Sequence, residues 1–335
     1  MFDITVVVPT YNRRKLLRVA IDSLRQQSHP ADRYEILIIS DGSTDGTDDD
    51  YRVPLDLPLT RLIRQEVEGF GLSAARNLGT REAKGRLVMF FDDDMVADKE
   101  LVKNHVEAHQ QFDENVAVCG RVKLAAELPN TPFCQIVLGD ICRLFAENEE
   151  EARFLSYHMA LSWQTSFKRS ALERVLGYDE TFQCYGWEDI EFSYRATQQG
   201  LRFFYEPKAL SYHNDRRNNL PSHAARVRNA AQMAPVLFAR HATLKTDLEM
   251  YQDKMPIDWK TDNSNLIAKK AMRQIIATPP MRQIFEISTP IVESLISRPK
   301  LLRRWYYNIL SNYMLIGYRE GLAMEATGAD APQTK

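Results

Sequence analysis

The chain has 335 residues, of which 26% are charged and 44% are hydrophobic, and its formal net charge is −2. This length supports one large or two modest domains, and the nearly balanced charge gives no general reason to expect nucleic acid as a partner. The four cysteines form no CxxC pair, so we expect neither a zinc site nor a disulfide framework. No signal-peptide pattern is found, and no apolar stretch approaches the roughly 18 to 20 residues that cross a bilayer, so we expect a cytoplasmic protein.

The first ninety residues alternate between strand-like and helix-like segments. β-Branched and apolar runs predict strands, and apolar residues at helical spacing predict helices. The strands are expected at 4–8, 35–40, 59–64 and 87–91, and the helices at 13–27 and 73–83. This alternation is typical of a parallel sheet in an α/β domain. Neither GxGxxG after the first strand nor GxxxxGK[ST] occurs, so the phosphates of a bound nucleotide would have to be neutralised in another way.

Three consecutive aspartates, Asp92, Asp93 and Asp94, follow the strand expected at 87–91. Open α/β sheets bind ligands at the carboxyl ends of their strands, so these side chains would lie at a ligand-binding edge. Their mutual repulsion requires a counter-charge, and carboxylate oxygens suit Mg²⁺ or Mn²⁺, which usually also bind substrate phosphates. A solvated acidic turn is the alternative that this motif alone leaves open.

Asp41 follows the second expected strand and could accept hydrogen bonds from a base or a ribose. It precedes Gly42 and Ser43, and all three are turn-forming residues, so a plain turn is the alternative.

The next part of the chain continues with mixed elements. Helices are expected at 98–112, 170–176 and 187–199, and strands at 116–125, 159–168, 201–205 and 209–212, while residues 126–160 give no clear pattern. His105 and His109 are four residues apart on the first of these helices, but the HExxH pattern is absent, so we expect solvent-facing histidines.

Glu188 and Asp189 fall in the first turn of the helix expected at 187–199. Acidic residues stabilise that end of a helix, and Asp189 could also take a proton from a substrate hydroxyl. His213 ends the last expected strand, and a neutral imidazole is a suitable ligand for Mn²⁺.

Three aromatic residues could offer flat faces to a sugar ring, with core packing as the alternative. They are Trp163, Tyr185 and Trp187.

Seven segments, in this order, resemble the inverting family-2 glycosyltransferases of the GT-A fold. They are VVVPTYNR (6–13), ISDGSTDGT (39–47), GLSAARNLG (71–79), GRLVMFFDDDM (85–95), FKRSALERVLGYDETF (167–182), GWEDIEFSYR (186–195) and EPKALSYH (206–213). The resemblance covers close to two thirds of the chain. It implies an α/β fold with a mostly parallel, Rossmann-like sheet flanked by helices.

The resemblance also implies roles for individual residues. The base and ribose of a nucleotide sugar would be held by Pro9, Thr10, Tyr11, Asn12 and Asp41, with Arg76 nearby. The DxD signature would be Asp92-x-Asp94, with Asp94 as the direct metal ligand, Asp93 beside the ribose and phosphate, and His213 as a further ligand. Asp189 would be the general base of an ED pair with Glu188.

The implied activity is transfer of a sugar from a nucleoside-diphosphate sugar, with a UDP-sugar expected, to a hydroxyl of a saccharide or lipid-linked acceptor. It would use Mn²⁺ or Mg²⁺, invert the anomeric configuration and serve polysaccharide or glycoconjugate synthesis. A haloacid-dehalogenase-like phosphatase is one alternative, because DDDMV fits DxDx[TV], although that pattern normally follows the first strand of its domain. A non-catalytic nucleotide-sugar-binding protein is the other.

The last third of the chain has helical periodicity, with breaks expected at its prolines, namely Pro235, Pro256, Pro279, Pro280, Pro290 and Pro299. We therefore expect a catalytic domain at 1–220, a helical region at 221–327 and a disordered tail at 328–335. Basic and aromatic residues at 298–310 could contact a membrane surface peripherally, and packing on the catalytic domain or on a second subunit of a homo-oligomer is the alternative.

Overall fold

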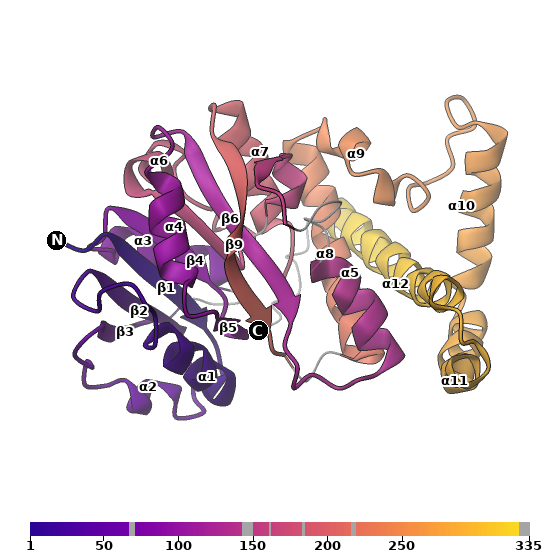
Figure 1. The fold of residues 1–335 in the computed structure, drawn as a ribbon. Helices are drawn as coiled ribbons and strands as arrows, with labels where there is room; N and C mark the ends of the chain where they lie inside the picture. The colour runs from indigo at the N-terminus through magenta and orange to yellow at the C-terminus, as the bar shows by residue number, and fades with distance from the viewer. Residues whose placement is uncertain (67–70, 143–149, 161, 183–184, 216–218, 328–335) are drawn as a thin grey trace. The chain divides into compact units, whose positions relative to one another are not determined.

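The computed structural model describes residues 1–66, 71–142, 150–160, 162–182, 185–215 and 219–327 (Figure 1). The chain divides into two compact units. The sheet unit comprises Met1–Pro129, Gly139–Thr181 and Glu188–Arg216, and the helical unit comprises Asn130–Leu138, Phe182–Trp187 and Arg217–Lys335. The tail expected at 328–335 and Cys184 lie outside the described residues.

One sheet contains all the strands of the described residues. They are β1 (Ile4–Thr10), β2 (Tyr34–Asp41), β3 (Leu59–Gln65), β4 (Leu87–Phe91), β5 (Met95–Ala97), β6 (Val116–Leu124), β7 (Arg153–Leu155), β8 (Gln164–Lys168) and β9 (Arg202–His213). The order is β3-β2-β1-β4-β8-β6-β9-β5, with β7 beside β9. Strands β1 to β4 are parallel, as expected, whereas β8 runs antiparallel to both β4 and β6.

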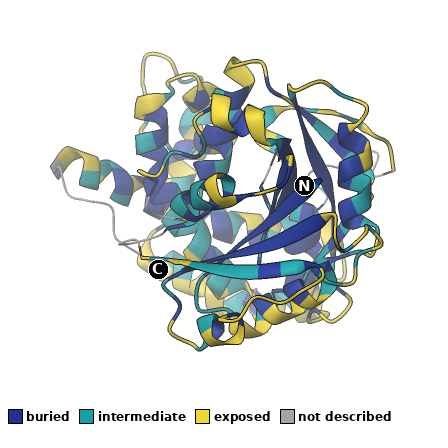
Figure 2. Ribbon diagram, turned by 90° about the vertical axis from the view of Figure 1, so that its left-hand side faces the viewer, coloured by how far each residue is buried: buried dark blue, intermediate teal, exposed yellow. Residues whose placement is uncertain are grey.

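Alternating residues of the central strands face two separate apolar cores. Val6 and Val8 of β1 pack in a core with helices α1 (Arg14–Leu24) and α4 (Leu101–His109). Val7 belongs to the core on the opposite face, with α3 (Leu72–Glu82), α6 (Arg169–Arg174) and α7 (Glu188–Gln198). Because helices cover both faces, the central strands β1, β2 and β4 are buried along their length, whereas the edge strand β3 is only partly buried (Figure 2).

Three expectations for the second half of the sheet unit are corrected. The strand expected at 159–168 begins only at Gln164, because Tyr157–Met159 forms a short 3₁₀ helix. The strands expected at 201–205 and 209–212 are one strand, β9, whose pairing with β6 shifts register between Gly120 and Arg121. Residues 126–160, which had no clear pattern, include β7 and the short helix α5 (Gly139–Cys142).

The helical unit is built mainly from helices α8 (Leu220–Arg240), α9 (Leu244–Asp247), α10 (Ser264–Ile276), α11 (Pro279–Leu295) and α12 (Pro299–Thr327). In the described residues, no helix is long and apolar enough to cross a membrane.

The breaks expected at Pro235 and Pro290 are wrong, because these prolines lie inside α8 and α11. A proline within a helix removes one backbone hydrogen bond at a cost of about 3 kcal/mol, which close tertiary packing can offset. Such packing is present for α8: a Cβ added to Gly317 of α12 would lie 2.0 Å from the carbonyl oxygen of Arg228.

His105 and His109 are buried, so the expectation of solvent-facing histidines is wrong. Both imidazoles hydrogen-bond to the hydroxyl of Ser166 on β8, at 2.8 Å and 2.9 Å. Burial lowers the pKa of His105 to about 4 and, together with the charges of His105 and Lys168, the pKa of His109 to about 3. The two neutral rings therefore pack α4 onto the sheet.

From these buried histidines we predict that the unfolding free energy of the protein decreases in mild acid. Their folded-state pKa values lie below the ordinary value of 6.5, so their contribution to stability is complete above pH 6.5 and decreases as the pH falls toward 4. His109→Gln should reduce the slope of unfolding free energy against pH in this range by about 1 kcal/mol per pH unit. Urea unfolding at several pH values would measure it, with the exposed His158→Gln as control. Equal slopes in all three proteins would contradict this account.

Candidate functional site

The predicted site residues of the sheet unit gather at one end of three neighbouring strands. Thr10 ends β1, Asp41 ends β2, and Asp92 follows β4 directly. Since β2, β1 and β4 are adjacent and parallel, their carboxyl ends meet at the same edge of the sheet. This edge is where open α/β sheets bind ligands.

Asp93 and Asp94 are buried, and both contact the guanidinium of Arg13. The Arg13 Nη1 atom lies 3.0 Å from Oδ1 of Asp93 and 2.8 Å from Oδ2 of Asp94, and the Thr10 hydroxyl donates to Asp93 at 2.7 Å. Burial raises the pKa of Asp93 to about 6 despite the opposing effect of Arg13. Sequence reasoning did not select Arg13, although it asked for a counter-charge and the residue closes the VVVPTYNR segment.

Arg76 holds a second group of carboxylates and is itself fully buried. Its guanidinium lies 2.8 Å from Asp189, 3.3 Å from Glu188 and 3.6 Å from Asp92. Burial raises the pKa of Asp92 to about 7, and burial with the neighbouring Asp189 charge raises the pKa of Glu188 to about 7. Arg76, expected near the base and ribose, therefore connects the aspartate run after β4 to the acidic pair that begins α7.

Tyr178 supports this group and was also missed in the sequence. Its ring stacks on Phe192 of α7 with centroids 4.3 Å apart, and the Arg76 guanidinium lies 5.0 Å above it. The Tyr178 and Ser162 hydroxyls are 2.5 Å apart, and the Ser162 amide approaches Asp189 at 3.4 Å. Tyr178 lies inside the segment 167–182, but a single tyrosine has no pattern that predicts a contact with Arg76, so only the fold identifies it.

Asp41 is buried and accepts hydrogen bonds from its own neighbourhood. The Gln65 side chain and the Gly71 amide each donate to its carboxylate at 3.1 Å. A Cβ on Gly71 would lie 2.4 Å from an Asp41 oxygen, so only glycine lets the start of α3 approach this closely. The position suits the predicted role in binding a base or ribose, which stays a prediction.

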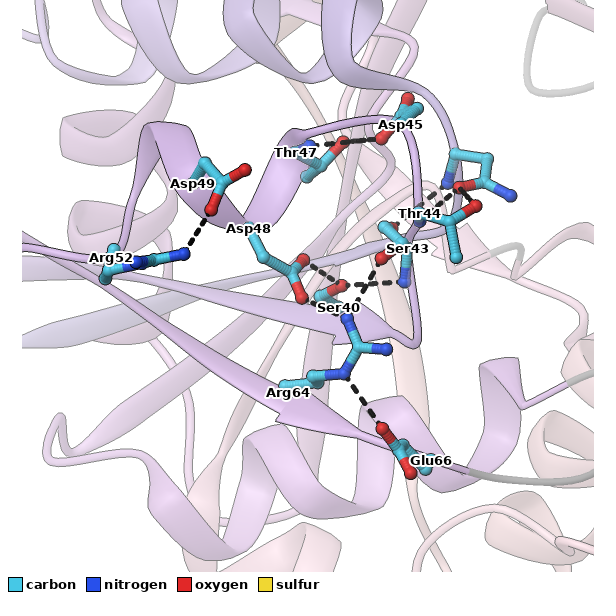
Figure 3. Close-up of polar contacts among 11 residues, drawn as sticks. Ser40, Ser43, Thr44, Asp45, Thr47, Asp48, Asp49, Arg52, Arg64 and Glu66 are labelled. Carbon is cyan, nitrogen blue, oxygen red and sulfur yellow. Dashed lines mark hydrogen bonds and ion pairs between the residues drawn. The ribbon is translucent and has the colours of Figure 1, made fainter.

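The two loops that precede α1 and α2 (Thr47–Asp50) are tied together. Asn12, whose φ is 51°, accepts from the Thr44 amide at 2.7 Å and its own amide donates to Ser43. Figure 3 shows the neighbouring contacts, in which the Asp48 carboxylate accepts hydrogen bonds from the Ser40 hydroxyl and the Arg64 guanidinium. Pro9 is a buried residue of β1, and Tyr11 is partly exposed beside it. The predicted residues 9–12 thus form a braced loop.

Asp94 and His213 can contribute to a metal site but cannot form one alone. His213 Nε2 lies 3.9 Å from Asp94 Oδ2, and among the described residues no group of three or more His, Cys, Asp or Glu side chains is placed to hold an ion. The buried Nδ1 of His213 has no hydrogen-bond partner in the described structure. One carboxylate and one imidazole fit an ion completed by substrate phosphates and water.

The three aromatic candidates belong to different units. Trp163, in the sheet unit, packs on the apolar core, and its carbonyl accepts from the Asp92 amide at 3.0 Å. Tyr185 and Trp187 belong to the helical unit. The Trp187 indole donates to the Ala230 carbonyl at 2.7 Å, and its φ of 73° is unusual for a bulky residue. Trp187 therefore has a packing role, and an acceptor role of all three stays a prediction.

Comparison with known proteins places this chain in a family. A sequence model of the Glycosyl transferase family 2 matches residues 5–176, more than half of the chain. The chain belongs to glycosyl transferase family 2. A second model, described as the N-terminal domain of galactosyltransferase, matches residues 151–217 of this family-2 protein.

This family-2 protein matches only part of the length of the curated relatives described next. It is 27% identical over 240 residues to chondroitin synthase of Escherichia coli, which covers 63% of this chain and 34% of that protein. It is 30% identical over 220 residues to validoxylamine A glucosyltransferase of Streptomyces hygroscopicus. This alignment covers 59% of this chain and 52% of that protein. The chain thus spans about a third to a half of these relatives.

Solved structures show the same fold. A mannosyltransferase from Pyrobaculum calidifontis, in complex with GDP-Man and Mn²⁺, gives a TM-score of 0.57 at 19% identity over 95% of this chain and 88% of that one. Staphylococcus aureus TarS, residues 1–349 in complex with UDP-GlcNAc, gives a TM-score of 0.50 at 16% identity. This match covers 98% of this chain and 93% of the TarS chain. The family-2 protein has the expected GT-A fold with a helical C-terminal region, which confirms both expectations.

The Arg76 cluster predicts a large effect of removing its cation. Arg76→Met would leave the buried Glu188 and the partly buried Asp92 and Asp189 without this counter-charge, which should reduce the unfolding free energy by about 3 kcal/mol. Arg81→Met, on the exposed side of the same helix, should change it by less than about 0.5 kcal/mol. Urea unfolding of both variants tests this, and a similar small loss in each would show that Arg76 is not essential to the cluster.

Proposed function

We propose that the protein is an inverting, metal-dependent glycosyltransferase that moves a sugar from a UDP-sugar, or another nucleoside-diphosphate sugar, to an acceptor hydroxyl. The observation that carries the proposal is the placement of buried Arg76, which contacts both Asp92 and the Glu188–Asp189 pair. A candidate phosphate-binding motif and a candidate base are thereby held in one charged cluster. Family membership and the GT-A fold support the same activity.

Asp189 is the proposed base because it is the more accessible acid of the pair. Its side chain is 19% exposed, against 5% for Glu188. The acceptor oxygen would bond to the anomeric carbon while the bond from that carbon to the diphosphate oxygen breaks, and the acceptor proton would pass to Asp189. A single displacement inverts the configuration and needs no covalent intermediate. Arg76 would then be a positioning residue that fixes the orientation of the base.

The diphosphate would lie at the carboxyl end of β4. Asp94 and His213 would hold Mn²⁺ or Mg²⁺ there, and the ion would stabilise the charge that develops on the leaving diphosphate. Asp93 and Thr10, joined by a hydrogen bond, and Asp41 are the proposed ribose and base contacts. The GDP-Man and UDP-GlcNAc complexes of the two structural neighbours support a nucleotide sugar as donor.

The two alternatives make different demands on the same residues. A haloacid-dehalogenase-type nucleophile would follow the first strand of its domain, whereas Asp92 follows the fourth strand in the chain. A non-catalytic binding protein would bind nucleotide sugar without turnover. The buried ionic support of Asp189 favours catalysis, since a binding protein has no use for an oriented base.

Two isosteric variants separate donor binding from transfer. Asp94→Asn should abolish the Mn²⁺-dependent part of nucleotide binding, measured by calorimetry over UDP, GDP and their sugars. Asp189→Asn should keep donor binding within about threefold and lower the transfer or donor-hydrolysis rate by about 10²-fold or more. Failure of the folded wild type to bind any of these nucleotides would overturn the proposal. Binding with no turnover on saccharide or lipid-linked acceptors would favour the non-catalytic alternative.

For the acceptor side, we propose that residues 221–327 hold the catalytic domain, 1–220, at an anionic membrane surface. Helix α11 carries four apolar side chains, each more than half exposed, at a spacing that aligns them on one face: Ile284, Ile287, Ile291 and Leu295. Exposed Arg298, Lys300 and Arg304 follow at its C-terminal end, without an ion pair to any described residue. Apolar side chains beside unpaired cations are typical of a helix that lies on anionic lipid.

The segment 298–310, for which the sequence predicts membrane contact, contributes its cations to the proposed lipid-binding surface more than its aromatic rings. Trp305 packs on Phe285 with centroids 4.7 Å apart and donates to Thr289, while Tyr306 is buried and donates to Glu293. These rings stabilise the packing of α11 on α12, so the lipid contact we propose centres on the exposed face of α11.

Vesicle binding tests this face. The wild type should co-sediment with vesicles that contain phosphatidylglycerol and not with neutral phosphatidylcholine, and Ile287→Glu/Ile291→Glu should lose most of this binding. Ser264→Glu/Asn265→Glu adds the same charge at two exposed positions of α10 and is the matched control. No sedimentation of the wild type would overturn the proposal, as would a dimer, seen by light scattering, that the isoleucine variant dissociates.

A further inference from the structure

We infer that Arg13 is a displaceable counter-ion that occupies a metal-binding oxygen until the donor arrives. This inference rests on the proposed function and adds a residue that couples metal binding to nucleotide binding. The evidence is that Arg13 Nη1 contacts Asp94 Oδ2 at 2.8 Å, and the same oxygen is the one that faces His213 Nε2 at 3.9 Å. A guanidinium and a metal ion cannot both contact that oxygen from the same side.

The charges around Asp94 show why a cation is required there. Burial alone would lower the pKa of Arg13, yet the charges of Asp93, Asp94 and Asp215 raise it above its ordinary value. Adjacent buried carboxylates repel one another unless a positive charge lies among them. Arg13 supplies that charge in the free protein. The binding free energy of an ion that replaces it is therefore reduced by the loss of the Arg13–Asp94 interaction.

Arg13 can leave its partners more easily than Arg76 can. The Arg13 side chain is 29% exposed and pairs through one nitrogen, whereas the Arg76 side chain is 2% exposed and pairs with three carboxylates. Arg13 also immediately precedes α1 and is not within a helix, so its side chain can turn without disturbing a packed face. Of the two arginines, only Arg13 has both a target oxygen on Asp94 and a route to solvent.

The donor would change this balance in two ways. Its diphosphate supplies oxygen ligands that complete the coordination of a metal held by Asp94 and His213. The same phosphates attract the guanidinium released from Asp94, so moving Arg13 away from Asp94 costs less free energy once a nucleotide is present. Metal and nucleotide should therefore bind cooperatively, and the free protein should bind metal weakly.

Mn²⁺ titration without activity measurement tests this inference, by calorimetry or by the electron paramagnetic resonance signal of free Mn²⁺. In the absence of nucleotide, Arg13→Gln should bind Mn²⁺ about tenfold more tightly than the wild type. Arg14→Gln removes the neighbouring charge, which pairs with Asp50 instead, and should leave the affinity unchanged. Thermal unfolding of each variant confirms that it is folded.

A second measurement separates displacement from general repulsion between Arg13 and the ion. UDP should raise Mn²⁺ affinity more in the wild type than in Arg13→Gln, because a displaced guanidinium opposes the ion only while nucleotide is absent. A fixed positive charge would instead lower the affinity to the same extent with and without UDP, which would overturn the inference. Unchanged or weaker Mn²⁺ binding by Arg13→Gln would also overturn it. Tighter binding without sugar transfer would support Arg13 displacement while the proposed activity failed.

Discussion

The excess of buried carboxylate charge at the carboxyl end of β4 is the constraint on which the site depends. Among the described residues, Arg76 contacts Asp92, Glu188 and Asp189, and Arg13 contacts Asp93 and Asp94. In the described part of the chain these two positive charges face five carboxylates, and burial with mutual repulsion raises the pKa of Asp92, Asp93 and Glu188. A site with such a deficit favours the entry of further cations, and a divalent ion with a diphosphate ligand is the form that the family suggests.

The two arginines divide the cluster into a fixed part and an adjustable part. Arg76 comes from α3, is fully buried and lies over the Tyr178 ring, so the acids that it contacts keep one orientation. Arg13 comes from the loop before α1 and contacts Asp93 and Asp94. A general base requires a constant position, whereas a metal ligand must exchange partners during each cycle. The placement of the arginines matches these two requirements.

The scaffold around the site explains how such charge can be buried at all. Apolar cores on both faces hold β1, β2 and β4 side by side, and the site needs their carboxyl ends to remain at one level. Close backbone approaches add precision, as where Gly71 contacts Asp41 and Gly79 lies against Val7. The packing energy of this scaffold allows the aspartates to remain in a strained electrostatic arrangement that they would not adopt alone.

The sequence by itself determined the local features: the alternation of strands and helices, the aspartates after β4, and the acids in the first turn of α7. These follow from periodicity and from neighbours in the chain, so they need no tertiary information. The tertiary structure alone decided which cations meet these acids, because Arg13 and Asp94 are 81 positions apart, and Arg76 and Asp189 are 113 apart. It also decided that His105 and His109 are buried under Ser166 and that Pro235 continues a helix, since in each case packing against a distant segment outweighs the local preference.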